Sequence, residues 1–278
     1  MNSLTLSEIE VQMLKEYIET SNLERSPLTN EYELLRVKDQ KVKLILYNSG
    51  KLVFNETNET LDILKSILIR EYDYDYYLGS DETGKGEWYG PLVVVVTALT
   101  SDEILELRLL GVKDSKTMKT NRIIEIAQEI MEKNIPYEYI VLSPESYNKL
   151  YQEFENEGKS LNDLMAWAHG RAIRELLERL EYEKVEVTVD KFDQMKMENR
   201  LKGLDRIKVK VIQKTGGECK TPVAAASIIA KYFFEQAVRG LNNEYKLDLK
   251  NMIPGDINPE ILPYVAKTHF KNVKNIIR

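Results

Sequence analysis

The sequence predicts an α/β protein, built on a mixed sheet with helices on its faces and preceded by a smaller α+β unit. In the first quarter of the chain, short strand-like runs are enclosed by two amphipathic helical segments. Further along, apolar or alternating strand-like runs take turns with helical segments, a pattern typical of an α/β sheet. We place the domain boundary after residue 71, which gives domains of residues 1–71 and 72–278.

The front domain is predicted from periodicity and turn signals. Residues 6–20 place apolar side chains at helical spacing, and a second helix is expected at 57–71 with Thr57 or Asn58 as its N-cap. Strand-like runs lie between them, at residues 32–38, 41–47 and 51–55. The turn sequence NSG separates the last two runs, so these two strands are expected to form a hairpin.

The second domain is predicted from longer apolar runs and clear alternation. PLVVVVTAL has the continuous apolar character of a buried strand, and VEVTVD and IKVKVIQ alternate. The expected strands are 76–81, 91–99, 137–143, 184–190 and 206–214. Helical stripes, together with Thr221 as a cap and Pro222 in a first turn, predict the helices. These are expected at 101–111, 119–133, 161–181, 221–238 and 259–269.

Composition limits the classes of protein to consider. The 278 residues are 43% hydrophobic and 30% charged, which is the balance of a globular protein. A net charge of −6 argues against a cationic field over the whole surface, although a local basic groove remains compatible with it. Cys219 is the single cysteine, and the start of the chain has no signal-peptide pattern. We expect a cytoplasmic enzyme or binding protein, with neither a membrane nor an obligate protein partner indicated.

Residues 79–91, GSDETGKGEWYGP, combine paired acids, a lysine between glycines and two aromatic residues. The spacing from Gly79 to Gly84-Lys85 matches most of a phosphate-binding P-loop. However, Gly86 stands where that motif needs a hydroxyl for Mg²⁺, and two acids inside the loop would repel phosphate. The sequence therefore disfavours a P-loop, whose ATP turnover would depend on Lys85.

A better interpretation makes the acids the functional groups. Asp81 and Glu82 end one predicted strand, Asp190 ends another, and Glu218 lies just before the helix that begins near Thr221. Carboxylates gathered at one place repel each other unless cations neutralise them. Such a set suits a pair of hard divalent cations that hydrolyse a phosphodiester. Each acid alone is as well explained as a solvated residue at the end of a strand; the joint pattern favours the metal site.

Several longer blocks resemble the type 2 ribonuclease H family, and most closely ribonuclease HIII. The blocks GSDETGKGEWYGPLVVV, GVKDSKTM, LNDLMAWAHGRAI, VTVDKFD, AAASIIAKY and AKTHFKN occur in the family's order over about residues 76–275. The resemblance implies a ribonuclease H-like fold, two Mg²⁺ or Mn²⁺ ions, and cleavage of the RNA strand of RNA/DNA hybrids to 5′-phosphate and 3′-hydroxyl ends. It places the metal-binding and catalytic acids at Asp81, Glu82, Asp190 and Glu218.

Two features favour ribonuclease HIII over the related ribonuclease HII. Ribonuclease HII typically carries Asp where Glu218 stands and Arg where Lys85 stands. In addition, the front domain resembles the small TATA-binding-protein-like substrate domain that ribonuclease HIII carries. A ribonuclease HII-type activity on single ribonucleotides embedded in DNA remains an alternative, as does a non-catalytic nucleic-acid-binding module.

The resemblance also implies residues that contact the substrate. The turn Gly84, Lys85 and Gly86 is similar to a family loop that follows the nucleic-acid backbone, where glycines allow close approach and 2′-hydroxyl contacts identify RNA. Further contacts are expected at Ser115, Lys116 and Ser227, although Ser227 is equally explained by close helix packing. In the front domain, Lys41 and Lys43 are predicted to share one basic sheet face that binds the duplex.

Other conspicuous residues have ordinary explanations. His169 shares a helical stripe with Met165 and Ile173, which predicts a hydrogen-bonded histidine of the core. His269 lies in the block AKTHF, but two-metal hydrolysis needs no histidine base. Trp88 and Tyr89 are expected to pack beneath the glycine-rich turn.

Overall fold

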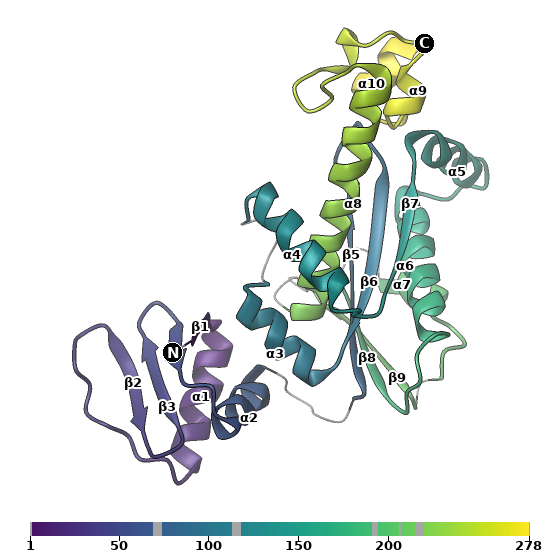
Figure 1. Cartoon of the computed structure of the whole chain (residues 1–278). Coiled ribbons are helices and arrows are strands. Elements are labelled where there is room, and N and C mark those ends of the chain that lie inside the picture. The colour runs from purple at the N-terminus through teal and green to yellow at the C-terminus, as the bar shows by residue number, and fades with distance from the viewer. Residues whose placement is uncertain are drawn as a thin grey trace. The chain divides into compact units, whose positions relative to one another are not determined.

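The computed structural model describes residues 2–68, 74–112, 118–190, 194–205, 207–214 and 220–277 (Figure 1). The chain divides into two compact units. The first comprises Met1–Tyr74 and Thr100–Val112, and the second comprises Asp75–Leu99 and Lys113–Arg278. The boundary predicted after residue 71 falls among residues 69–73, which lie outside the described part.

The first unit is an antiparallel sheet backed by helices. Its strands are β1 (Asn2–Thr5), β2 (Glu33–Lys38), β3 (Lys43–Tyr47) and β4 (Lys51–Phe54), in the order β1-β4-β3-β2. Its helices are α1 (Glu8–Thr20), α2 (Asn58–Leu68) and α3 (Ser101–Leu110). Strand β1 has four residues, too few for a periodic signal, and was not predicted from the sequence.

One face of this sheet is covered, because alternate residues of its strands are apolar. The side chains buried there with those of the three helices include Leu44, Leu46, Leu52, Phe54, Leu14, Ile63 and Leu105. Helix α3 is tied to the unit by Arg108, which donates to the Thr5 carbonyl at 2.9 Å and to Glu10 at 3.0 Å. Among the described residues, the opposite face carries the exposed side chains of Lys38, Lys43 and Lys51.

The second unit contains a five-stranded sheet in the order β7-β6-β5-β8-β9. The strands are β5 (Tyr76–Thr83), β6 (Leu92–Leu99), β7 (Tyr137–Leu142), β8 (Val185–Asp190) and β9 (Val209–Lys214). β5 and β7 pair antiparallel to β6, whereas β8 is parallel to both β5 and β9. The mixed sheet predicted from the sequence is confirmed.

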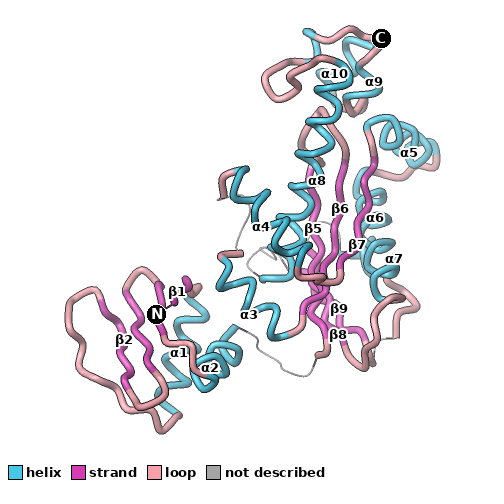
Figure 2. Tube along the Cα trace, viewed as in Figure 1, coloured by secondary structure: helices cyan, strands magenta, loops and turns pink. Residues whose placement is uncertain are grey.

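Helices cover both faces of this sheet (Figure 2). They are α4 (Thr120–Glu132), α5 (Pro144–Asn156), α6 (Leu161–Leu177), α7 (Gln194–Arg200), α8 (Thr221–Tyr245), α9 (Leu262–Val265) and α10 (Lys271–Ile277), with a 3-10 turn at Pro254–Asp256. Helix α8 runs along β5 and β6 with α4 packed on it, and α6 packs on the other face with α7. The sheet is therefore sandwiched, and all of β6 is buried.

The predicted helices need correction in several places. Helices α5, α7 and α10 were not predicted, and α8 continues to Tyr245 rather than ending at residue 238. The helix predicted at 259–269 is much shorter than expected, since α9 spans Leu262–Val265. Ala266 then has an extended backbone with φ −131° and ψ 152°, and it forms a β-bridge with Tyr89. Long-range pairing outweighs the local helical tendency there.

Close approach of α8 to β5 depends on a glycine. A β-carbon on Gly79 would lie 2.1 Å from the backbone nitrogen of Val223, so a side chain there would collide with the first turn of α8. Thr97 of β6 fixes the same turn by donating to the carbonyl of Pro222 at 2.9 Å. These contacts hold the start of α8 against β5 at Gly79, which lies two residues before Asp81.

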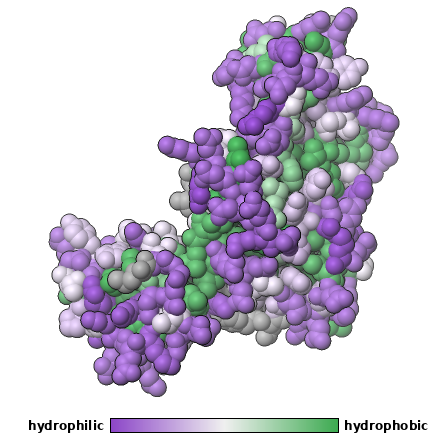
Figure 3. Space-filling view, viewed as in Figure 1, coloured by the Kyte–Doolittle hydropathy of each residue, from purple (hydrophilic) through white to green (hydrophobic). Residues whose placement is uncertain are grey.

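The surface is mainly polar. Hydrophilic residues cover most of the face seen in Figure 3, as expected for a chain with 30% charged residues. Among the described residues, no helix combines the length and the apolar character needed to cross a bilayer.

Candidate functional site

Two adjacent acids, Asp81 and Glu82, lie at the end of β5 and are held from opposite faces of the sheet. Successive residues of a strand point to opposite faces. Asp81 shares its face with Gly79, which meets α8, and the hydroxyl of Ser227 on α8 hydrogen-bonds to the Asp81 carboxylate. Glu82 points to the other face, where His169 of α6 contacts its carboxylate. Each acid therefore has its own helix-borne partner.

The environment of Asp81 disfavours a carboxylate without a counter-charge. Burial raises the pKa of Asp81, and the neighbouring Glu82 charge raises it further, to about 6. The hydrogen bond from Ser227 opposes this shift. Ser227 itself is only 7% exposed, so its hydroxyl is committed to this contact inside the protein.

Glu82 has the opposite balance. Burial would raise the pKa of Glu82, but the hydrogen bond and charge of His169, with the charge of Lys85, lower it to about 2. His169 Nε2 lies 3.2 Å from Glu82 Oε2, and Lys85 Nζ lies 3.5 Å from Glu82 Oε1. Glu82 is thus held as an anion.

His169 joins Glu82 to the strand beneath it. Its ring is 1% exposed, and its Nδ1 lies 2.7 Å from the hydroxyl of Ser80. The Ser80 hydroxyl also donates to the Val95 carbonyl at 3.1 Å, so the ring is held between β5 and the Glu82 carboxylate. The prediction of a hydrogen-bonded core histidine is confirmed, but its contact with Glu82 was not foreseen, because α6 and β5 are remote in sequence.

The sheet register brings a third predicted acid to the same edge. β5 and β8 are parallel, and Ser80 pairs with Val189. The next residues in the two strands, Asp81 near the end of β5 and Asp190 at the end of β8, therefore lie at the same level of the sheet. The side chain of Asp190 lies outside the described part.

The fourth predicted acid, Glu218, lies outside the described residues, but the chain just after it is described. Lys220 Nζ donates to Glu186 Oε1 at 2.6 Å and to Thr188 Oγ1 at 3.2 Å, both on β8. Lys220 is two residues after Glu218, and Thr188 is two residues before Asp190. Within the described ranges, no three His, Cys, Asp or Glu side chains are grouped as a metal site.

The donor set nevertheless suits a hard cation. Asp81 and Glu82 supply carboxylate oxygens, the ligands that Mg²⁺ and Mn²⁺ prefer. Their mutual repulsion, visible in the raised pKa of Asp81, is what a bound cation would relieve. Lys85 is the nearby cation, and at 3.5 Å its side chain pairs with Glu82 only loosely.

The glycine-rich turn follows directly after these acids. Gly84 has φ +94°, and a β-carbon there would lie 2.2 Å from the Pro91 carbonyl oxygen, so only glycine fits. Gly86 is exposed, with open space around it. Tyr89 packs against Phe234 of α8 at 6.0 Å between ring centroids, which confirms the predicted packing role of this aromatic residue.

The remaining predicted substrate contacts are Ser115, Lys116 and Ser227, and of these the structure describes Ser227. Ser115 and Lys116 lie outside the described residues. Ser227 is buried against Asp81, so close packing and a hydrogen bond explain it within the described part of the chain. Whether these three residues touch substrate stays a prediction.

In the first unit, Lys43 lies on the uncovered face of the sheet, opposite Lys38 across the β2–β3 pair. Lys41 precedes β3 and pairs with Glu59 at 2.6 Å. Val42 between the two lysines is buried, whereas Lys41 and Lys43 are exposed, so the alternation of burial continues through Lys41. That these two lysines bind the duplex stays a prediction.

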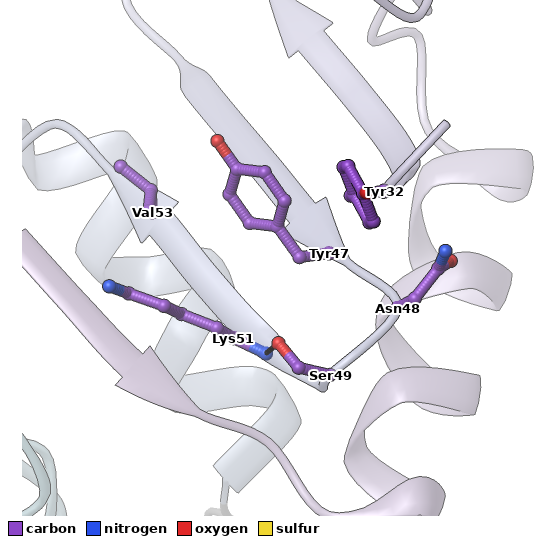
Figure 4. Close-up of a pocket in the computed structure, with 6 residues that line it drawn as sticks. All are labelled: Tyr32, Tyr47, Asn48, Ser49, Lys51 and Val53. Carbon is purple, nitrogen blue, oxygen red and sulfur yellow. Dashed lines mark hydrogen bonds between the residues drawn. The ribbon is translucent and has the colours of Figure 1, made fainter. Parts of the chain in front are cut away.

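Sequence reasoning missed an aromatic recess on this same face. Residues Tyr32, Tyr47, Asn48, Ser49, Lys51 and Val53 line a recess of about 480 Å³. Figure 4 shows the Tyr32 and Tyr47 rings beside each other, with Lys51 and Val53 on the neighbouring strand β4. Alternation within the predicted strands places Tyr47 and Lys51 on one face, but no signal indicated that Tyr32, which lies just before β2, packs beside them.

Comparison with known proteins assigns a family. A family model described as Ribonuclease HII matches residues 78–253. Ribonuclease HIII of Chlamydia abortus is 32% identical over 88% of this chain and 88% of its own length. Ribonuclease HIII of Oceanobacillus iheyensis is 29% identical over 95% of this chain and 94% of its own length. The similarity to ribonuclease HIII thus extends into the residues before 78, which the family model does not reach.

Solved structures agree with this result. The crystal structure of Bst-RNase HIII in complex with Mn²⁺ matches 99% of this chain and 97% of its own chain, with a TM-score of 0.63 and 26% identity. Aquifex aeolicus RNase H3 shares the fold, with a TM-score of 0.56 and 23% identity. From the mixed sheet, the acids at its edge and these relatives, we conclude that the chain belongs to the type 2 ribonuclease H family, with ribonuclease HIII as its branch.

Proposed function

We propose that the protein is an endoribonuclease that hydrolyses the RNA strand of RNA/DNA hybrids, using Mg²⁺ or Mn²⁺. The observation that carries the proposal is the parallel register of β5 and β8, which brings Asp81 near the end of β5 to the level of Asp190 at the end of β8. Family membership adds the reaction class, and the relative solved with Mn²⁺ supports the choice of cation.

Asp81, Glu82, Asp190 and Glu218 are the proposed metal ligands. These four acids would hold two divalent ions, which would supply an activated water and charge stabilisation for a leaving 3′-oxygen, consistent with 5′-phosphate and 3′-hydroxyl ends. The protein's part is orientation. Ser227 fixes the Asp81 carboxylate from α8, and His169 fixes the Glu82 carboxylate from α6. Such outer contacts hold ligands in position for a metal.

Recognition of RNA is proposed for the turn Gly84-Lys85-Gly86, next to these acids in the chain. Gly86 is exposed and lacks a side chain, so a nucleic-acid backbone can approach its peptide closely. Contacts from peptide groups to 2′-hydroxyls distinguish RNA from DNA. Ser115 and Lys116 are proposed as further backbone contacts, from the family resemblance alone.

The first unit is proposed to hold the duplex through the uncovered face of its sheet. Lys38, Lys43 and Lys51 are exposed there, and Lys51 also lines the recess formed with Tyr32 and Tyr47. Lysines attract phosphates without reading sequence, which suits an enzyme that acts on hybrids in general. The cytoplasm is the proposed location, because a chain with a single cysteine suits a reducing compartment.

A ribonuclease HII-type activity on single ribonucleotides in DNA is a second candidate, because the matching family model is described as Ribonuclease HII. A duplex with one embedded ribonucleotide and one with four consecutive ribonucleotides, assayed side by side, separates the two. Ribonuclease HIII-like activity predicts cleavage of the four-ribonucleotide duplex and little cleavage of the other.

The central test is Asp81→Asn, assayed with Mg²⁺ or Mn²⁺ on a labelled hybrid. Hydrolysis is expected to fall at least about 1,000-fold, because the variant loses a metal-binding charge. Hybrid binding, measured by fluorescence anisotropy, is expected to survive. Cleavage at the wild-type rate by this variant would contradict the proposal, and absence of any metal-dependent cleavage by the wild type would favour a non-catalytic binding module.

A further inference from the structure

Lys267 satisfies four consecutive backbone carbonyls of another segment. Its amide donates to the Trp88 carbonyl at 2.7 Å. Its side-chain nitrogen donates to the carbonyls of Glu87 at 3.0 Å, Tyr89 at 2.9 Å and Gly90 at 2.8 Å. The path of the loop after the glycine-rich turn is therefore defined by one residue that is remote in sequence.

The side chain is enclosed as well as bonded. Lys267 is 0% exposed, whereas lysine is almost never fully buried unless it is paired. Three carbonyls match the three N–H groups of an ammonium, and the Tyr147 ring lies 5.8 Å from the nitrogen. Burial lowers the pKa of Lys267 to about 7, with the Glu87 charge opposing the shift. The fully donating ammonium form is therefore present below pH 7.

A second polar residue fixes the segment that carries Lys267. Asn148 of α5 donates to the carbonyls of Pro263 and Ala266, at 3.0 and 2.9 Å. Its own oxygen accepts from the amide of Thr268 at 2.8 Å. Asn148 thus brackets Lys267 from both sides, and the backbone that presents the lysine is held by α5.

The loop that Lys267 holds is continuous with the glycine-rich turn. The amide of Glu87 donates to the Gly84 carbonyl at 3.3 Å, which closes the turn over Lys85 and Gly86. At the other end, the amide of Gly90 donates to the Val265 carbonyl at 2.9 Å. Displacing the carbonyls of Glu87 to Gly90 would therefore displace the turn itself.

We infer that Lys267 is a positioning residue for substrate binding, which acts by fixing the loop Glu87–Gly90 and with it the turn Gly84–Gly86. The inference rests on the proposed function, in which that turn contacts the hybrid. Loss of Lys267 is therefore expected to weaken substrate binding and to leave the chemical step unchanged, because Asp81 and Glu82 are held independently by Ser227 and His169.

The kinetic test is Lys267→Met, which keeps an unbranched chain of similar length and removes the three donors. Cleavage of a hybrid is measured below pH 7 with saturating Mn²⁺. KM is expected to rise about tenfold while kcat stays within about twofold, because the loss is one of uniform binding. Lys271→Met, which removes an exposed lysine four residues away, is the matched control and should leave both constants unchanged.

A second measurement reports on the loop without catalysis. Trp88 lies in the loop and Trp167 is the other tryptophan, so Trp167→Phe leaves one fluorophore there. In that background, Lys267→Met is expected to increase acrylamide quenching of Trp88, whereas Lys271→Met is not. If Lys267→Met does not fold, Asn148→Ala serves instead, with a smaller rise in KM and in quenching.

The outcomes separate the two claims. A folded Lys267→Met variant with unchanged KM and unchanged Trp88 quenching would overturn the positioning role, as would a fall in kcat at constant KM. Absence of cleavage by the wild-type protein, with Trp88 quenching still raised in the variant, would count against the proposed function and leave the control of the loop by Lys267 intact.

Discussion

The uncovered face of the first unit's sheet and the edge of the second unit's sheet are both candidate contacts for nucleic acid, but they are built differently. On the first, Lys38, Lys43 and Lys51 stand in solvent on separate strands. At the second, Asp81 and Glu82 are partly buried, and each depends on a partner from a different helix. The first arrangement predicts small, additive effects of substitution, and the second predicts large effects that depend on one another.

The largest effect is expected where the second site depends on backbone contact. Gly79→Ala places a β-carbon 2.1 Å from the Val223 nitrogen, so α8 must move away from β5 and take Ser227 with it. We expect a loss of stability on the order of 3 kcal/mol or more, because the colliding atoms are backbone. Thermal unfolding followed by circular dichroism measures it.

Gly86→Ala is the matched control for this prediction, because a β-carbon there meets open space. Its melting temperature should stay within about 1–2 °C of the wild type, since exposed substitutions usually change stability by less than 0.5 kcal/mol. If Gly79→Ala melts like Gly86→Ala, the close contact of α8 with β5 is not what positions Asp81.

The next effect concerns the partner of Glu82. His169→Ala removes the group that contacts Glu82 at 3.2 Å and is expected to lower kcat by about 10- to 100-fold, the usual cost of losing an outer contact of a metal ligand. Ser80→Ala, on the other side of the ring, should cost less. An effect of His169→Ala below twofold would show that Glu82 needs no support from α6.

Much of this second site was predictable because the ends of its strands can be identified from the apolar and alternating patterns of the sequence. The run that ends in Asp81 and Glu82 and the alternating run that ends in Asp190 both proved to be strands of the mixed sheet. Parallel neighbours then follow from the α/β pattern. The roles of Ser227 and His169 were not predictable, because they depend on which helix covers which face.

Other failures have the same origin. The extended backbone at Ala266 pairs with Tyr89, which is remote in sequence, so local periodicity favoured a helix. On the first unit's sheet, the contact of Lys41 with Glu59 of α2 was not foreseen, because strand alternation says nothing about the helix that follows.

A smaller effect is expected on the first unit's sheet. Lys43→Ala and Lys51→Ala should each raise KM for the hybrid by about two- to fivefold, and the double variant should show the product of the two factors. Each should also reduce the slope of log K against log salt by about 1 per lost phosphate contact. Lys41→Ala, whose side chain pairs with Glu59, is the control and should change the slope less. A strongly non-additive double variant would contradict the contrast between the two sites.

The smallest effect concerns Glu33, a carboxylate of the first unit whose pKa depends on hydrogen bonds from its neighbours. Glu33 accepts hydrogen bonds from Arg36 and from the amide of Thr29, and these lower its pKa from 4.5 to about 2. A group whose pKa is lower in the folded state stabilises that state above the unfolded value, and the benefit is lost as pH falls. We therefore expect the first unit to lose stability between about pH 4.5 and pH 2.

Glu33→Gln should be less stable at neutral pH and should lack this part of the pH dependence. Hydrogen exchange of the β3 amides reports it locally, which separates it from the titration of carboxylates in the second unit. Thr29→Val, which keeps Glu33 but removes a hydroxyl donor at 2.7 Å, should move the loss to higher pH. If the stability of the first unit falls with pH in the same way in the wild type and in Glu33→Gln, the Glu33 carboxylate does not stabilise this unit. The contrast between the exposed lysines of the first unit and the interdependent acids of the second would then be sharper.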